Sequence, residues 1–255
     1  MTRLELPSIA RQRTVAATID EVGAAVRGAA PEVAAERTSF IDMLYAALAF
    51  TGLFIVLCCM VYPLLVWGVA QAMFPVQANG SLITRAGAFT TDPEEAVGSA
   101  QLSQNFAAAG YFHPRPSAAG SGFDAASSGG TNLGPLSDKL LNGIHDAKNP
   151  DGTPNPAGNF DGIKDLTAAY RAENGLADDA IVPADAVTRS ASGLDPHISP
   201  ENARLQASRV ATARGQSLDR VQRLIAQHTD QPALGILGDP GVNVLMLNLA
   251  LDKAR

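Results

Sequence analysis

The chain has 255 residues and a formal net charge of −6 at pH 7, with 46% hydrophobic and 17% charged residues. This acidic balance argues against a nucleic-acid-binding protein, because such proteins need a surplus of basic side chains. The only two cysteines, Cys58 and Cys59, are adjacent and lie in an apolar run, which excludes a disulfide framework and a cysteine-based metal site.

The first 39 residues form an N-terminal arm that carries equal numbers of acidic and basic side chains. Apolar residues recur at helical spacing from Val15 to Val26, so a short amphipathic helix is one alternative for this arm. An arm without regular structure is the other. We expect the arm, residues 1–39, to be cytoplasmic and assign it no role.

The apolar composition and the length of residues 40–74 predict a single transmembrane helix. No charged residue occurs from Met43 to Thr84, and the apolar stretch is roughly 40 Å long as a helix, more than the roughly 30 Å that a bilayer core requires. A soluble core helix would keep a polar stripe, which is missing here. Pro63 is the expected kink, and Pro75 ends the apolar run too early for a second span.

A secretory signal peptide is the main alternative to an anchor, since Ala70-Gln-Ala72 has the form of a cleavage site. The apolar run is longer than a signal peptide needs, and it begins about forty residues into the chain, so an uncleaved anchor is favoured. Arg27 and Arg37 precede the run, and Arg85 is the nearest basic residue after it. The positive-inside rule then places the N-terminus in the cytoplasm and the larger C-terminal part outside.

Residues 75–255 predict a soluble, extracytoplasmic domain of helices separated by Gly- and Pro-rich connections. Five helices are expected, each beginning at a capping residue. They are Pro93–Ala109, a short helix after Ser137, Asp161–Glu173, a helix from Pro200 that stops at Gly215, and a helix opened by Ser217 and Asp219.

Strands are predicted at Ala180–Thr188 and Val242–Leu249, which are rich in β-branched residues. Residues 110–162 predict mostly loops. The predicted fold class is α+β, with one N-terminal transmembrane helix followed by a soluble domain of helices and a small sheet. His228 lies on the apolar face of the last predicted helix and is expected to be a partly buried core residue, so no metal site is expected.

Two chemical hypotheses arise from single residues. Asp195 and His197, with Ser117 or Ser192, invite a Ser-His-Asp arrangement, which would make the protein a membrane-anchored serine hydrolase. No serine lies in a Gly-x-Ser-x-Gly elbow, however, and Asp195 and His197 are only two residues apart in a proline-bound loop. A non-catalytic role is therefore favoured, and no catalytic residue is assigned.

The second hypothesis is phosphate binding by the Gly129-Gly130 stretch. A glycine pair can expose backbone N–H groups to an anion, and arginine gives bidentate contacts to phosphate. The candidate arginines lie on two adjoining predicted helices: Arg204, Arg209, Arg214, Arg220 and Arg223. The sequence has no Walker lysine and no dinucleotide fingerprint, so a flexible loop beside a solvated arginine face remains the simpler alternative.

The most informative segment is the nine-residue stretch Ser192–Pro200. Pro196 and Pro200 hold it extended, and Ser199 with Pro200 begins a helix. The stretch resembles the C subunit of the Kdp-type potassium-transporting P-type ATPase. From about Leu53 to the end, further segments of that family match in the same order: Val61–Pro63, Tyr111–Ala119, Ser128–Pro135, Val182–Pro183, Arg209–Arg214 and Gly241–Asp252.

The resemblance implies an accessory subunit of an ATP-driven, high-affinity potassium uptake complex in the bacterial inner membrane. Its implied partners are a channel-like potassium-binding subunit and an ATP-hydrolysing subunit. The family's C subunit is described as a catalytic chaperone that raises the affinity of the pump for ATP. We therefore expect no tightly bound cofactor and no ATP hydrolysis by this chain alone, with ATP bound, if at all, through the complex.

Polar groups on the matching loops are the candidate interaction or nucleotide-linked residues. They are Arg115, Ser117, Gly129, Gly130, Asn132, Asp195, His197 and Ser199. Structural hydrogen bonding within the loops would explain them equally well. The sequence departs from the family pattern at Ser103, Arg189 and Ala191, and the segment from Lys148 to Asn159 resembles an insertion that lengthens the central loop.

Overall fold

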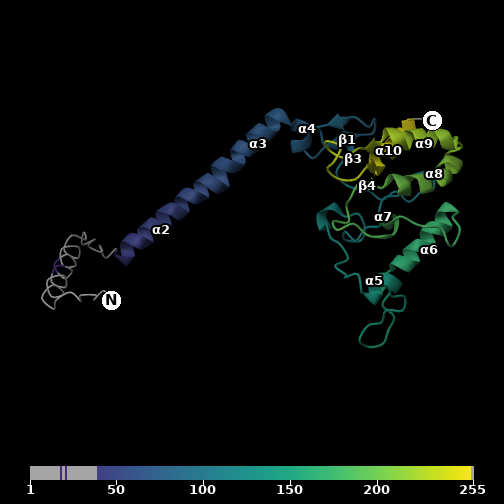
Figure 1. Cartoon of the computed structure of the whole chain (residues 1–255), viewed down its shortest axis with the longest axis horizontal. Helices are drawn as coiled ribbons and strands as arrows, with labels where there is room; N and C mark the ends of the chain where they lie inside the picture. The colour runs from purple at the N-terminus through teal and green to yellow at the C-terminus, as the bar shows by residue number, and fades with distance from the viewer. Residues whose placement is uncertain (1–17, 19–20, 22–38, 254–255) are drawn as a thin grey trace, which may run out of the picture. The chain divides into compact units, whose positions relative to one another are not determined.

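The computed structural model describes residues 18, 21 and 39–253, and Figure 1 gives the order of the elements. The chain divides between Leu64 and Leu65 into two units. We call residues 75–253 the lobe. The stretch from Val15 to Val26, where an amphipathic helix is one alternative, lies outside the described residues except for Thr18 and Glu21.

The apolar run forms one continuous helix from Phe40 to Met73, built of α2 (Phe40–Ile55), a π-helical segment η1 (Val56–Val61) and α3 (Tyr62–Met73). Ser39 is its N-cap, and the Ser39 hydroxyl accepts the N–H of Ile41. No residue of the helix is buried. By length and composition it is able to cross a membrane, which fits a single-pass membrane protein.

The π-helical segment ends two residues before Pro63, the expected site of a kink. Pro63 has no N–H, and its ring would clash with the carbonyl group four residues earlier in a regular α-helix. The helix loosens at this point, and the N–H of Tyr62 bonds the carbonyl of Leu57, five residues back. The proline therefore coincides with a local irregularity of the backbone, as its chemistry requires.

The lobe contains both helices and short strands. Its α-helices are α4 (Pro75–Ala78), α5 (Asp138–Asn142), α6 (Ile163–Asn174), α7 (Ala184–Val187), α8 (Pro200–Arg214), α9 (Leu218–Gln227) and α10 (Val244–Lys253). Two 3₁₀ turns, η2 (Ala125–Ser127) and η3 (Pro156–Gly158), lie in the loop-rich middle. The serine caps predicted at Ser137, Ser199 and Ser217 are confirmed, since each hydroxyl accepts an N–H of the first turn.

Two small antiparallel sheets complete the α+β fold. The first has the order β2-β1-β3, with β1 (Leu82–Thr84) between β2 (Phe89–Thr90) and β3 (Ala96–Ser99). The second has the order β4-β6-β5, with β6 (Gly241–Asn243) between β4 (His197–Ile198) and β5 (Thr229–Asp230). In the second sheet His197 pairs with Asn243 and Asp230 with Gly241, so the Ser192–Pro200 stretch is anchored to the C-terminal part of the chain.

The helix predicted over Pro93–Ala109 is wrong. Asp92 caps a single turn, after which the chain forms β3 and pairs with β1. A side chain at Gly98 would collide with Gln104, whose own side chain bonds the carbonyl of Val97. The chain thus folds back on itself here, a tertiary contact that overrides the local helix signal.

Both predicted strands of the C-terminal half are also corrected. Ala180–Thr188 is mostly irregular and ends in the short helix α7, which follows Pro183. In Val242–Leu249 only the start is a strand, and α10 begins at Val244. The buried residues Val244, Leu247, Asn248 and Leu251 lie at positions i, i+3, i+4 and i+7, which is the helical period.

The main core lies between α8, α9, α10 and β6. On α8, Ala203, Ala207 and Ala211 are buried at four-residue spacing, and small side chains let neighbouring elements approach the helix closely. Phe112 is fully buried in the same core, although it belongs to an irregular segment. Figure 1 shows α8, α9 and α10 gathered together, with α6 and α5 beyond them.

The buried amide of Asn248 on α10 anchors this irregular segment. The Asn248 side chain accepts the N–H of Phe112 at 2.8 Å and donates to the carbonyl of the same residue at 2.9 Å. The two bonds pair both backbone groups of a residue that has no strand partner. An unpaired buried backbone group costs about 1–3 kcal/mol, so this side chain is important for stability.

We predict that Asn248→Leu, which keeps the side-chain volume, lowers the free energy of unfolding by about 3 kcal/mol because two backbone groups lose their partner. Asn149→Ala, at an exposed hairpin, is the matched control and should change it by less than about 0.5 kcal/mol. Denaturant unfolding of the detergent-purified full-length chain measures both. Equal effects of the two variants would contradict the role of Asn248.

Candidate functional site

The candidate residues other than Asn132 meet at the loop Ser190–Ser199. Arg115 donates to the carboxylate of Asp195 at 3.0 Å. The Ser117 hydroxyl donates to the carbonyl of Gly193 at 2.6 Å, and the N–H of Gly129 donates to the carbonyl of Ser192 at 2.9 Å. Loops more than sixty residues apart in the sequence are thereby joined into one surface.

Gly193 holds the centre of this loop. Its φ of +69° lies in the left-handed region, and a Cβ atom here would lie 2.6 Å from the Ala119 nitrogen and 2.8 Å from the Gly129 carbonyl oxygen. Gly130 also lies against the loop, with Ala191 O only 2.8 Å from the position of a Cβ atom. The glycines therefore serve close packing of backbone on backbone.

The hydroxyl of Ser117 takes part in this packing through hydrogen bonds to the backbone. Besides donating to Gly193, its hydroxyl oxygen accepts the N–H groups of Ala119 at 3.1 Å and Phe123 at 2.9 Å. Among residues 39–253, no hydrogen bond joins Ser117 to His197 or to Asp195. The hydroxyl is thus saturated by the backbone and lacks the base that a serine nucleophile requires.

Asp195 and His197 form a small charged group with Arg115 and Asp230. The His197 Nδ1 lies 3.8 Å from Asp195 Oδ1, and its Nε2 lies 3.6 Å from Asp230 Oδ2; both are ion-pair rather than hydrogen-bond distances. Interaction with the His197 side chain is the largest cause that lowers the pKa of Asp195 to about 2, and Arg115 adds to it. Asp195 in turn raises the pKa of His197 against the opposing effect of burial.

Ser199 caps α8 and is itself held by Asp185. The Ser199 N–H and hydroxyl donate to the two carboxylate oxygens of Asp185 at 2.8 and 2.9 Å, and the amide of Asn202 donates to Asp185 at 2.9 Å. Asn132, the last candidate, is an exposed residue with a φ of +52°. Arg115, Asp195, His197 and Ser199 thus line one pocket of about 650 Å³, whereas Asn132 does not.

The arginines of the phosphate hypothesis contact a different part of the lobe from the glycine pair. Arg209 donates to the carbonyl groups of Ala109 at 2.7 Å and Tyr111 at 3.0 Å. Arg214 bonds the carbonyl of Gly110 and the carboxylate of Asp252, and its guanidinium stacks on the Tyr111 ring. Arg204 pairs with Glu201 on its own helix. These three arginines therefore have protein partners in place of an anion.

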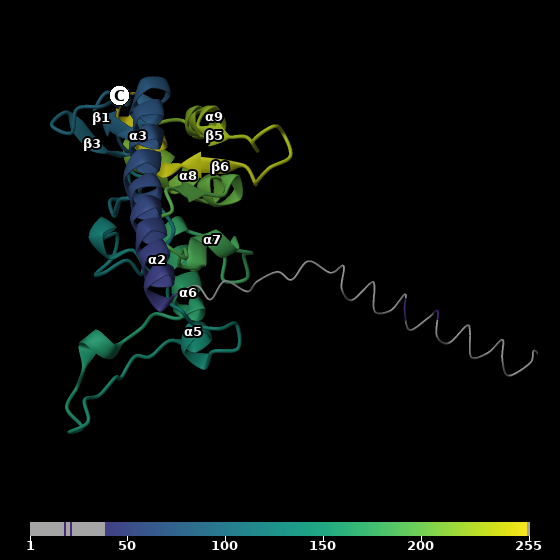
Figure 2. The same ribbon diagram turned by 90° about the vertical axis from the view of Figure 1, so that its left-hand side faces the viewer.

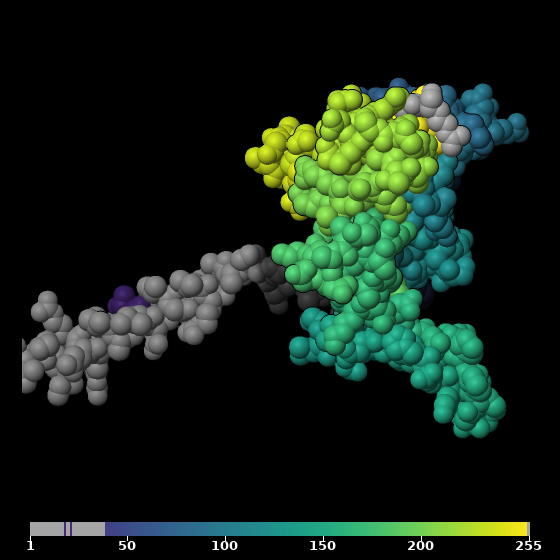
Figure 3. Space-filling view, turned by 90° about the vertical axis from the view of Figure 1, so that its right-hand side faces the viewer, coloured from purple at the N-terminus to yellow at the C-terminus, as the bar shows by residue number. Residues whose placement is uncertain are grey.

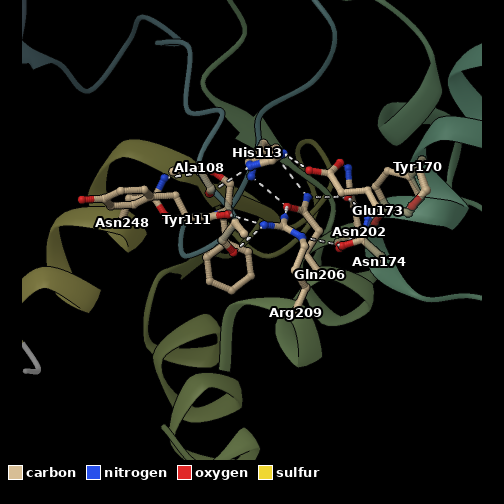
Figure 4. Close-up of polar contacts among 12 residues, drawn as sticks. Ala108, Tyr111, His113, Tyr170, Glu173, Asn174, Asn202, Gln206, Arg209 and Asn248 are labelled. Carbon is tan, nitrogen blue, oxygen red and sulfur yellow. Dashed lines mark hydrogen bonds and ion pairs between the residues drawn. The ribbon is translucent and has the colours of Figure 1, made fainter. Parts of the chain in front are cut away.

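A second set of polar side chains lies in the interior of the lobe (Figure 4). We call Tyr170, Asn202 and Gln206, together with the backbone of His113, the amide network. Gln206 on α8 accepts the N–H of His113 at 2.7 Å and donates to the carbonyl of His113 at 3.1 Å. Tyr170 donates to Asn202 at 2.9 Å, and burial, with Asp185 nearby, raises the pKa of Tyr170, which keeps the phenol neutral. The network leaves a cavity of about 330 Å³ between α6, α8 and the residues after His113.

His113 lies at the edge of this network with its ring between two acceptors. Nδ1 is 2.9 Å from the carboxylate of Glu173, and Nε2 is 3.2 Å from the carbonyl of Ala108. Burial is the main cause that lowers the pKa of His113, and Arg209 adds to it.

Sequence reasoning missed Asn202, Asn248 and Asp185. An amide side chain at an apolar position of a helical pattern is the signal that could have found the two asparagines.

One set of metal-ligating side chains lies together in the described part of the lobe. Ligand atoms of His145, Asp161 and Asp165 all lie within 4.8 Å of one another. Asp165 already accepts the N–H of Gly162 as a helix cap and lies 3.4 Å from the His145 ring. Capping and ion pairing account for the arrangement, so we assign no metal to it.

We predict that the stabilisation contributed by His197 depends on pH. Because its pKa in the folded state lies above the ordinary 6.5, the contribution is complete below about pH 6.5 and is lost as the pH rises through the raised value. The difference in unfolding free energy between wild type and His197→Gln should therefore be larger at about pH 5.5 than at about pH 9, by less than about 1 kcal/mol because the ring is partly exposed.

Asp195→Asn provides the control for this prediction. The substitution removes the carboxylate that is the main cause of the raised pKa of His197. In the Asp195→Asn variant, the contribution of His197 to the unfolding free energy should therefore change less with pH. The contribution of Asp195 itself has the opposite sign, since its lowered pKa means that the stabilisation is lost only as the pH falls from about 3.8 towards about 2. A His197 contribution that is constant with pH would contradict the pairing.

Comparison with known proteins identifies the family of this fold and site. Residues 44–253 match the sequence model of the KdpC family, described as the c chain of K+-transporting ATPase. Proteins named potassium-transporting ATPase KdpC subunit are similar over most of their length. The one from Mycobacterium tuberculosis (strain ATCC 25618 / H37Rv) is 49% identical over 210 residues, which cover 82% of this chain and 97% of the relative.

Two further relatives with the same name come from Caulobacter. The protein of Caulobacter vibrioides (strain NA1000 / CB15N) is 51% identical over 207 residues, which cover 81% of this chain and 90% of the relative. The protein of Caulobacter sp. (strain K31) is 48% identical over 206 residues, which cover 81% of this chain and 91% of the relative. The matched region includes nearly all of the long apolar helix and the whole lobe, and the chain therefore belongs to the KdpC family, the C subunits of potassium-transporting ATPases.

Proposed function

We propose that this chain is the accessory subunit of an ATP-driven, high-affinity potassium uptake complex and that it stabilises the assembly. The observation that carries the proposal is the family match over residues 44–253. The site supports a structural role over a catalytic one, because its polar groups are paired with one another and with backbone groups. Ser117, the candidate nucleophile of the hydrolase alternative, has three backbone partners, so no observation favours hydrolysis.

The chain lies in the bacterial inner membrane with its N-terminus in the cytoplasm and its lobe outside. The long helix has Ser39 at its start and no charged residue from Met43 to Thr84, while basic residues precede it at Arg27 and Arg37. This charge distribution supports the orientation through the positive-inside rule. In the complex, the helix packs among the membrane helices of the channel-like subunit, and the lobe covers the entrance of that subunit.

The subunit also raises the ATP affinity of the ATP-hydrolysing subunit, acting as a catalytic chaperone. ATP is cytoplasmic, so a lobe outside the membrane cannot contact it and must act through the assembly. Arg204, Arg209 and Arg214 are paired within the lobe, which further supports an indirect effect over a phosphate contact. By linkage, a subunit that binds the ATP-bound state of the pump more tightly increases its affinity for ATP by the same factor.

We predict that the affinity-tagged full-length chain co-purifies from membranes with two larger membrane proteins and with potassium-stimulated ATPase activity. A complex prepared without this chain should show a higher KM for ATP or fail to assemble. Purification of the chain alone would contradict the proposal. Hydrolysis of ester or peptide substrates by the chain, lost in Ser117→Ala, would favour the hydrolase instead.

We predict that protease added to intact spheroplasts digests the lobe. The hairpin around Asn149–Thr153 is exposed and offers a site for cleavage, and a fragment that retains the long helix should remain in the membrane. An epitope placed before Ser39 should be protected until the membrane is broken. Protection of the lobe in intact spheroplasts would reverse the orientation and make direct contact with ATP possible.

A further inference from the structure

A narrow apolar projection extends from the second sheet of the lobe. We call residues 231–240, which join β5 and β6, the finger, and Figures 2 and 3 show it standing out from the body of the lobe. Its tip exposes 89% of Leu234, 81% of Ile236 and 60% of Leu237. Such a cluster of large aliphatic side chains in water is unfavourable unless another surface covers it.

The tip is a hydrogen-bonded turn that presents these side chains to the outside. Ala233 and Leu237 exchange both backbone hydrogen bonds at 2.9 Å, and the N–H of Gly235 bonds the carbonyl of Pro232 at 2.9 Å. Leu234 has a φ of +54°, a conformation that is unfavourable for a bulky residue. The hydrogen bonds of the turn hold this backbone conformation, but no described residue covers the leucine side chain, so a contact from outside the chain would remove the cost of its exposure.

The charges around the finger are acidic. Residues 229–241 contain Asp230 and Asp239 but no lysine or arginine. The pocket of about 650 Å³ beside the finger, which Pro232 and Leu237 help to line, contains four carboxylates, those of Asp185, Asp195, Asp230 and Asp239. Its only basic side chains are Arg115, which is paired with Asp195, and His197. An apolar tip thus stands beside a cleft of net negative charge.

This combination argues for a protein partner over a lipid surface or a second copy of the chain. Lipid-binding segments carry Lys, Arg, Trp or Tyr to match anionic headgroups and the interface, and the finger has none of them. A second copy would bring another acidic cleft and a net charge of −6. A partner that offers an apolar pocket bordered by basic residues would match both the tip and the cleft.

We infer that the finger docks in an apolar pocket bordered by Lys or Arg side chains on a larger subunit of the same transporter. The inference rests on the proposed function, since it requires the chain to be part of that assembly. Leu234 and Ile236 fill the pocket of the partner, and the carboxylates of Asp230 and Asp239 pair with its basic rim. Moving these two large aliphatic side chains from water into a well-packed pocket would contribute to binding through the hydrophobic effect.

Photo-crosslinking within the intact complex tests the contact directly. A photoreactive amino acid replaces Ile236 in the full-length chain, which is expressed with the remaining subunits. The control carries it at Leu136, an equally apolar residue that is 98% exposed elsewhere in the lobe. We expect a crosslink to one larger subunit from position 236 and not from position 136. Crosslinks to lipid, to a second copy, or to no protein from position 236 would overturn the inference.

Substitution distinguishes docking from folding. Leu234→Gly relieves the strained backbone, so it should keep the thermal stability of the chain while lowering the amount of larger subunit that co-purifies by about tenfold. Ile236→Asp should do the same, and Leu136→Asp should not. Asp239→Asn should make retention of the chain by the complex less sensitive to salt.

The outcomes also separate this inference from the proposed function. If the wild-type chain co-purifies with no larger subunit, the proposed function fails. If the wild-type chain co-purifies and Leu234→Gly and Ile236→Asp retain the partner at wild-type levels, only the docking role of the finger fails.

Discussion

The lobe depends on side-chain amides and one guanidinium that pair the backbone of an irregular segment. Asn248 on α10 bonds both backbone groups of Phe112, and Gln206 on α8 does the same for His113. Arg209 bonds the carbonyl groups of Ala109 and Tyr111. Buried backbone groups must have partners, and here helices supply them through side chains where a sheet would supply them through strands.

This arrangement explains how the site is held in place without many strands. The segment that these side chains hold continues directly into Arg115 and Ser117, which bond the loop Ser190–Ser199. That loop is anchored at its far end by β4 and by the cap of α8. Nearly every polar group at the site thus has a structural partner, which suits a fixed surface for assembly and is unsuitable for a reacting group that must be free to exchange protons.

Features that depend on neighbouring residues could be predicted from the sequence. The long apolar helix, the serine caps at Ser137, Ser199 and Ser217, and the α+β class follow from composition and capping chemistry. The predictions failed where distant contacts decide. Pro93–Ala109 has the signals of a helix, but the chain turns back here and pairs with β1. Val242–Leu249 has the composition of a strand, but most of it forms a helix whose buried face includes the polar Asn248.

The candidate site shows the same division. Pro196, Pro200 and Ser199 reveal a shaped loop that begins a helix, because their effects are local. No local pattern reveals that Ser117 meets Gly193, or that Asp185 holds Ser199, because these pairs are separated by 76 and 14 residues. The relation between a loop and its distant partners is a property of the packed lobe, and it became visible only in three dimensions.

Hydrogen exchange at the backbone amides of Phe112 and His113 in the intact full-length chain tests the central claim most directly. If Asn248 and Gln206 pair this segment as described, both amides should exchange as slowly as those in the core of α8, although they lie outside any helix or strand. Exchange as fast as that of the exposed hairpin at Asn149–Thr153 would contradict the account.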